Sequence, residues 1–108
     1  MAVKIKYRGD TLDIFVTSTR IEGKNEIFQT LVEDNTLPKE VENLVFDLNE
    51  VDYVNSLGIA EFISIHRYFS SVNQGRTRMR FVNVEPKIAQ LFEMVELGNL
   101  SEVQKKDR

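Results

Sequence analysis

The chain has 108 residues, 42% of them hydrophobic and 29% charged, and its formal net charge is −3. A chain of this size buries about two-thirds of its unfolded surface, so the composition predicts a folded globular domain. An acidic balance argues against nucleic-acid binding, which draws on clustered Lys and Arg. The sequence contains no cysteine, which excludes disulfides, zinc–thiolate sites and thiol catalysis.

No apolar run approaches the roughly 20 residues of a membrane-spanning helix. The N-terminal stretch "MAVKIKYRGD" alternates apolar and polar residues and lacks the continuous apolar core of a signal peptide. We therefore expect a cytoplasmic protein without membrane insertion, monomeric when free.

The first segments predict a β-hairpin followed by a helix. Apolar and polar residues alternate through Val3, Ile5 and Tyr7, and the alternation resumes after a turn at Gly9-Asp10, through Leu12, Ile14 and Val16. The apolar spacing then becomes helical over residues about 23–34, and the turn chemistry up to Pro38 ends that helix.

The middle of the chain predicts a strand and a long helix. The run "NLVFDL" at residues 43–48 is nearly continuously apolar, which favours a central strand covered on both faces. A helix follows from about Leu57 to Asn73. Its expected buried stripe comprises Ile59, Phe62, Ile63, His66 and Phe69.

The last part of the chain predicts a strand over residues 78–84 and a helix from Pro86 to about Val95, stopped by Gly98. Residues 101–108 read as a polar tail that frays, outside a core of residues about 3–100. The whole chain, residues 1–108, is expected to be one α/β domain. Its single mixed sheet would have about four or five strands, with a parallel core and the antiparallel hairpin at its edge, packed by three or four helices.

The residues do not assemble a catalytic or metal site. His66, the single histidine, lies ten residues after Ser56 on the same predicted helix, roughly 15 Å away at 1.5 Å per residue, beyond hydrogen-bond reach. Its expected role is that of a half-buried helix residue. Asp47, Glu50 and Asp52 cluster after the central strand, where a solvated loop is favoured over a site for a hard cation. We expect neither an enzyme nor a bound cofactor.

The junction "YVNSLGIAEF", residues 53–62, follows the carboxyl end of the central strand, where open α/β sheets meet their ligands and partners. Ser56 reads most simply as a helix cap, because serine and asparagine are favoured at that position. Gly58 in the first turn permits close approach of another surface.

Two separated blocks together resemble a STAS domain of the anti-anti-sigma-factor kind. The first is "NLVFDLNEVDYVNSLGIAEFISIHRYFSSVNQG", which is similar to the family's pattern of a central strand, Asp-Leu, a loop, Asp-Ser-Ser/Thr-Gly and an apolar helix. The second is "MRFVNVEPKIAQLFEMVELGNL", with a strand, a helix opening at proline, Leu-Phe and a closing Gly-hydrophobic pair. The resemblance extends over roughly residues 10–104.

The resemblance implies a partner-switching protein. In that family a serine kinase that acts as an anti-sigma factor binds the domain and phosphorylates a hydroxyl just before the glycine. A PP2C-type phosphatase reverses the modification, and only the unmodified domain holds the kinase. The output is transcription or another process such as biofilm formation.

Carried over by position, Gly58 matches the glycine and Ser56 the first hydroxyl, while Asn55 replaces the usual aspartate and Leu57 the second hydroxyl. Ser56 is then the motif's one phosphate acceptor, unless the kinase requires the second position. The expected partner-binding residues are Asn55, Ser56, Leu57, Gly58, Glu61 and Ser64, with Leu57, Glu61 and Ser64 on the exposed side of the helix; residues 20–22 are a weaker candidate.

Two alternatives stay open. One is a STAS adaptor subunit of an ABC-type transport complex, which needs no phosphorylation and suits the atypical Leu57. The other is an enzyme or a small-ligand sensor of the same fold, with a nucleotide as one such ligand.

Overall fold

The N-terminal hairpin forms one edge of a five-stranded mixed sheet. In the computed structural model, which describes residues 2–34 and 36–107, β1 (Val3–Arg8) pairs antiparallel with β2 (Thr11–Val16) across a turn in which Gly9 has a φ of 62°. β2, β4 (Asn43–Asp47), β6 (Arg78–Val84) and β7 (Glu102–Lys105) then run parallel, in the order β1-β2-β4-β6-β7. The predicted mixed sheet with an antiparallel edge is confirmed.

Within the described residues, four helices connect the strands: α1 (Glu26–Glu33), α2 (Ser56–Val72), α3 (Pro86–Glu93) and α4 (Leu97–Leu100). Pro86 opens α3 as predicted, because proline at the first helical position loses no hydrogen bond. The structure does not support Gly98 as a helix stop, since this residue lies inside α4. Its Cα packs so closely on the end of α3 that an added Cβ would lie 2.7 Å from the Phe92 carbonyl oxygen.

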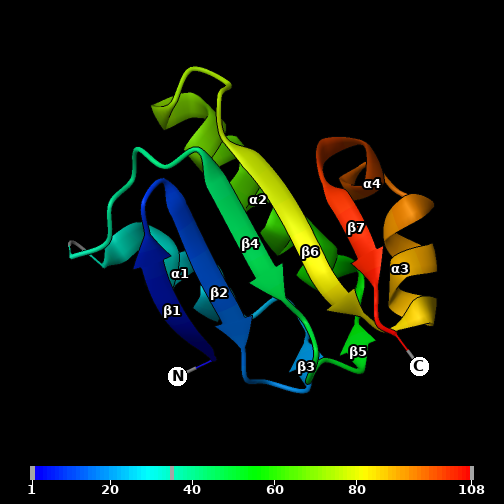
Figure 1. Cartoon of the computed structure of the whole chain (residues 1–108). Helices are drawn as coiled ribbons and strands as arrows, with labels where there is room; N and C mark the ends of the chain where they lie inside the picture. The colour runs from blue at the N-terminus through cyan, green and yellow to red at the C-terminus, as the bar shows by residue number, and fades with distance from the viewer. Residues whose placement is uncertain (1, 35, 108) are drawn as a thin grey trace.

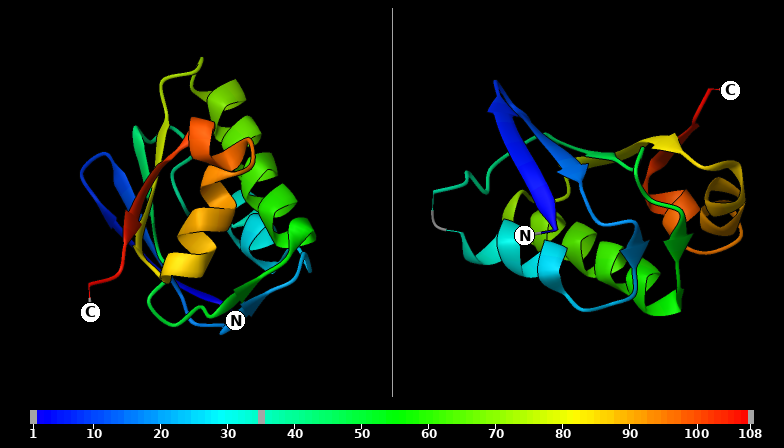
Figure 2. Two further views of the ribbon diagram at one scale, coloured as in Figure 1. Left: turned by 90° about the vertical axis from the view of Figure 1, so that its right-hand side faces the viewer. Right: turned by 90° about the horizontal axis from the view of Figure 1, so that it is seen from below.

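All four helices lie on one face of the sheet (Figures 1 and 2). The parallel strands follow one another in a single direction across the sheet, so right-handed crossovers place every helix on the same side. The expectation that the central strand is covered on both faces is therefore wrong. In β4, Leu44 and Phe46 are buried on the helix side, whereas Val45 on the other side is only half-buried.

The core lies between the sheet and the helices and is built around phenylalanines. Phe62 of α2 contacts Phe46 and Phe81 edge-to-face, with ring centroids 5.2 and 4.9 Å apart. Phe92 of α3 meets Phe81 at 5.0 Å. The predicted stripe on α2 is correct at Ile59, Phe62 and Phe69, but Ile63 and His66 are half-buried, and Ile65 is the fully buried residue of that turn.

The C-terminal segment is ordered as a strand, which corrects the expectation of a fraying tail. β7 pairs with β6, and its Val103 is half-buried opposite Phe81. Beyond the strand, the Lys106 amide donates to the Val84 carbonyl at 2.8 Å, and the Lys106 ammonium donates to the Asn49 carbonyl at 2.7 Å. The polar residues of this segment face water on an edge strand, and a sequence with so little apolar alternation gives no strand signal.

Ending the chain after Ser101 should lower the free energy of unfolding by about 1–2 kcal/mol, because it removes the β7 ladder and the partly buried Val103. Urea unfolding of this truncation would be compared with a chain that ends after Lys106 and retains β7. Equal midpoints for the two chains would show that β7 contributes nothing to the fold.

Candidate functional site

The first turn of α2 is capped by Asn55. This residue has an extended backbone (φ −102°, ψ −177°), and its side-chain Oδ1 accepts a hydrogen bond of 2.9 Å from the Gly58 amide. An asparagine in this position satisfies one of the amides that a helix leaves free at its N-terminus. The interpretation of Ser56 as the helix cap is therefore wrong, since Asn55 fills that role and Ser56 is the first helical residue.

Ser56 is left with an uncommitted hydroxyl. Its side chain is exposed, and within residues 2–34 and 36–107 its hydroxyl has no hydrogen-bond partner. No acidic residue lies in the first turn of α2. A phosphate attached here would stand beside the positive end of the helix dipole, which favours an anion by about 0.3–1 kcal/mol.

A small second sheet holds the segment that precedes α2. β3 (Arg20–Ile21) and β5 (Tyr53–Val54) run parallel, with Arg20 opposite Tyr53. The Asn55 amide then donates to the Ile21 carbonyl at 3.2 Å. A two-residue strand is too short to show periodicity in the sequence, and the sequence predicted no strand in this loop.

Two glycines let this small sheet pack directly on the first turn of α2. A Cβ on Gly58 would lie 2.5 Å from the Ile21 carbonyl oxygen, and a Cβ on Gly23 would lie 2.3 Å from the Cβ of Leu57. Gly23 also has a φ of 85°, which side chains rarely adopt. The close approach that Gly58 permits is thus made by the chain itself, and Gly58 is buried.

Glu61 is not on the exposed side of α2, contrary to expectation. It is only 4% exposed, and its Oε2 accepts hydrogen bonds from the amides of Ile27 at 2.9 Å and Phe28 at 3.0 Å. Asn25, the residue before α1, has a φ of 61° and provides no side-chain cap. A carboxylate from α2 therefore satisfies the start of α1 in place of a local cap.

The surface around Ser56 carries two large exposed apolar side chains. Leu57 is 61% exposed and Tyr53 39% exposed, and Ser64 is exposed two turns further along α2. The guanidinium of Arg20 lies 4.0 Å from the centre of the Tyr53 ring and 3.1 Å from the Glu22 carboxylate. The hydrogen bond to Glu22 raises the pKa of Arg20 above its ordinary value. Of the predicted partner-binding residues, this surface therefore includes Ser56, Leu57 and Ser64.

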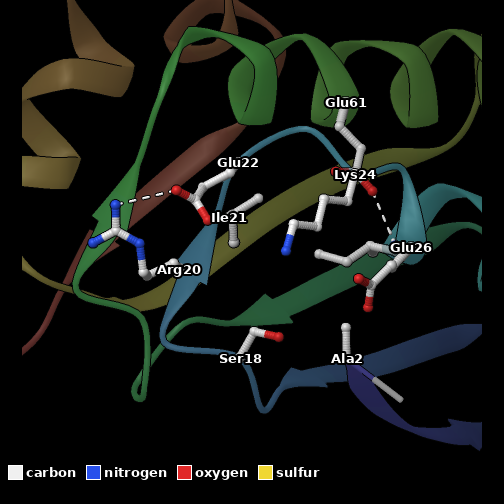
Figure 3. Close-up of a pocket in the computed structure, with 9 residues that line it drawn as sticks. Ala2, Ser18, Arg20, Ile21, Glu22, Lys24, Glu26 and Glu61 are labelled. Carbon is white, nitrogen blue, oxygen red and sulfur yellow. Dashed lines mark hydrogen bonds and ion pairs between the residues drawn. The ribbon is translucent and has the colours of Figure 1, made fainter.

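A hollow of about 70 Å³ lies behind this surface, between β3, the start of α1 and α2. Figure 3 shows Glu61 reaching from α2 to the start of α1, with Arg20, Glu22 and Lys24 along the hollow. Ligand sites for small molecules measure roughly 300–1,000 Å³, so this hollow does not favour a nucleotide.

The other polar residues singled out in the sequence have structural surroundings. His66 is half-buried on α2, and burial lowers its pKa, an effect that the Glu96 carboxylate opposes. The Asp47 carboxylate accepts hydrogen bonds from the Asn49 amide at 3.0 Å and from the Asn83 side chain at 3.1 Å. Within the described part of the chain, no three acidic or histidine side chains gather as a metal site would require.

Replacing Glu61 with alanine should lower the free energy of unfolding by about 2–3 kcal/mol, because two amides at the start of α1 lose a charged acceptor. Ser64→Ala, an exposed change on the same helix, is the matched control and should alter stability by less than about 0.5 kcal/mol. Chemical denaturation measures both. A loss no larger for Glu61→Ala than for Ser64→Ala would contradict the capping role.

Comparison with known proteins places these features in a family. Residues 3–106 match the STAS domain. Two curated proteins named anti-sigma-B factor antagonist, from Listeria monocytogenes and Listeria innocua, are each 27% identical over 111 residues, with 95% of this chain and 88% of theirs covered.

Solved structures share the fold at lower identity. A candidate anti-sigma factor antagonist of Thermotoga maritima has a TM-score of 0.70 at 15% identity, covering 95% of this chain and 86% of its own. The unphosphorylated anti-sigma factor antagonist SpoIIAA has a TM-score of 0.69 at 15% identity, covering 94% and 87%. Part of a murine anion transporter, member A9 of solute carrier family 26, also has this fold, with a TM-score of 0.70 at 13% identity, but only 17% of that chain is matched. The match to the STAS domain spans nearly the whole chain, and the protein belongs to the STAS family.

Proposed function

We propose that the protein is a partner-switching regulator that binds an anti-sigma-type serine kinase through the surface around Ser56. Phosphorylation of Ser56 releases the partner, and a PP2C-type phosphatase restores binding. The names of the Listeria relatives and the STAS fold support a regulator that is not an enzyme. The site of action is the cytoplasm. Among residues 2–34 and 36–107, no helix has both the length and the apolar character of a membrane span.

One observation carries the proposal: Asn55 caps α2, so the Ser56 hydroxyl is exposed and free of any structural bond within the described residues. A hydroxyl that capped the helix would be shielded, and modifying it would cost the helix its cap. Ser56 can instead accept a phosphate without the loss of any hydrogen bond that the fold uses.

The exposed apolar side chains beside Ser56 explain why a phosphate would release the partner. Leu57 and Tyr53 offer area that a partner can bury, with the Ser56 hydroxyl between them in the sequence. A phosphate adds about −1.5 to −2 charges at this place. Burying such a charge without a partner costs several kcal/mol, and each 1.4 kcal/mol weakens binding tenfold.

The fold itself tolerates the phosphate. The dipole of α2 favours an anion at its N-terminus, and the first turn of α2 contains no carboxylate that would repel it. Asn55 provides the cap without charge, whereas an aspartate there would face the phosphate at close range. Release of the partner is thus an electrostatic effect at the interface and does not require the domain to unfold. The freed partner then controls transcription or another output such as biofilm formation.

The test incubates the protein and ATP with a serine kinase of the anti-sigma type from the same cells. Mass spectrometry should place the phosphate on Ser56. Ser56→Ala should bind the kinase as the wild type does, and Ser56→Asp should bind about tenfold or more weakly with an unchanged unfolding midpoint.

Ser71→Asp is the matched control, because it places the same charge on an exposed serine of the same helix, about four turns away from Ser56. It should weaken binding less than Ser56→Asp does. Identical binding by Ser56→Ala and Ser56→Asp would refute the switch. If the protein instead copurified with a transport ATPase, unaffected by either variant, the adaptor function would replace it.

A further inference from the structure

The face of the sheet opposite the helices is uncovered by any described element. The strand register arranges its side chains in three rows across the sheet, and Figure 1 views this face with the helices behind it. We call this surface the open face. Its rows are Lys4, Phe15, Asp47 and Val82; then Lys6, Asp13, Val45, Arg80 and Glu102; then Arg8, Thr11, Asn43 and Arg78.

Three apolar side chains lie at the centre of the open face. Phe15, Val45 and Val82 come from three successive strands, β2, β4 and β6, and each is half-buried. Together with Lys4, Lys6, Asp13 and Asp47 they line a shallow hollow of about 340 Å³. The register places Phe15 and Val82 on either side of Asp47, and Val45 in the next row, so the three apolar side chains lie close together on the uncovered face.

The charges of the open face are opposite in sign to those of the whole chain. Five basic and three acidic side chains give it a charge of +2, whereas the chain carries −3. Arg8 pairs with Asp13, and Arg80 pairs with Glu102 at 2.9 Å. Lys4, Lys6 and Arg78 are exposed and have no ion pair within the described residues, so three cations are available to a ligand.

We propose that the open face docks an acidic, amphipathic segment of a partner protein. Carboxylates of the segment would meet Lys4 and Lys6, and its apolar side chains would cover Phe15, Val45 and Val82. A second copy of this chain placed face to face would set +2 against +2, which is unfavourable. Nucleic acid or an anionic lipid surface would bring a continuous array of phosphates against Asp13 and Asp47, whereas a protein segment can place uncharged residues over them and its carboxylates only at Lys4 and Lys6.

This docking surface is distinct from the one around Ser56. The open face lies on one side of the sheet, and α2 with its exposed side lies on the other (Figure 2). A partner on the open face would therefore remain bound whether or not Ser56 carries a phosphate. The inference stands apart from the proposed switch and would survive its failure.

The test places the photoreactive amino acid p-benzoylphenylalanine at position 45 of the full chain, in the cells that make the protein. After irradiation, the cross-linked segment is mapped by mass spectrometry. The expected adduct is with a segment in which carboxylates accompany apolar residues. Lys4→Glu combined with Lys6→Glu should reduce its yield about tenfold or more, because repulsion replaces attraction.

The matched control reverses two other exposed lysines, Lys87 and Lys105, which makes the same change in net charge away from the open face. Its adduct yield should equal that of the parent, as should the yield with Ser56→Asp. Urea midpoints verify that every variant is folded. No adduct, an adduct with lipid or with a second copy, a cross-linked segment without carboxylates, or a yield indifferent to the reversal of Lys4 and Lys6 would overturn the proposal.

Discussion

The site depends on a contact in which no side chain separates β3 from the first turn of α2. The Ile21 carbonyl oxygen accepts a hydrogen bond from the Asn55 amide. The same oxygen would lie 2.5 Å from a Cβ added to Gly58. Gly23, two residues after β3, packs against Leu57, where an added Cβ would lie 2.3 Å from the Leu57 Cβ. With the backbones this close, Asn55 is held at the cap position and the side chains of Ser56 and Leu57 are directed outward.

The same region is tied to the rest of the helical layer by Glu61. This residue lies five positions after Ser56 on α2, and its buried carboxylate holds the start of α1. The surface around Ser56 therefore rests on β3, β5, α1 and α2 together. A site supported in this way can gain or lose charge without changing its backbone, which suits a switch that acts on its partner's binding.

Local sequence signals predicted the hairpin, the strand at residues 78–84 and the proline-led helix, because alternation and Pro86 report on nearby residues alone. Features that depend on distant segments were missed. Glu61 is buried only because α1 lies against α2, and β7 is a strand only because β6 offers its edge. The assignment of the cap to Ser56 was wrong for a smaller reason, since Asn55 and Ser56 are both favoured caps and the geometry of one residue decides between them.

The most direct test of this account is amide hydrogen exchange in the Gly58→Ala variant. Ala60→Gly, the reverse change at an exposed position of α2 two residues later, serves for comparison. Alanine ordinarily favours a helix over glycine by about 1 kcal/mol. If β3 must approach α2 without a side chain, Gly58→Ala will lose stability despite that gain, and the Asn55 amide will exchange faster. A Gly58→Ala protein that is more stable than the wild type, with the Asn55 amide still protected, would contradict the account.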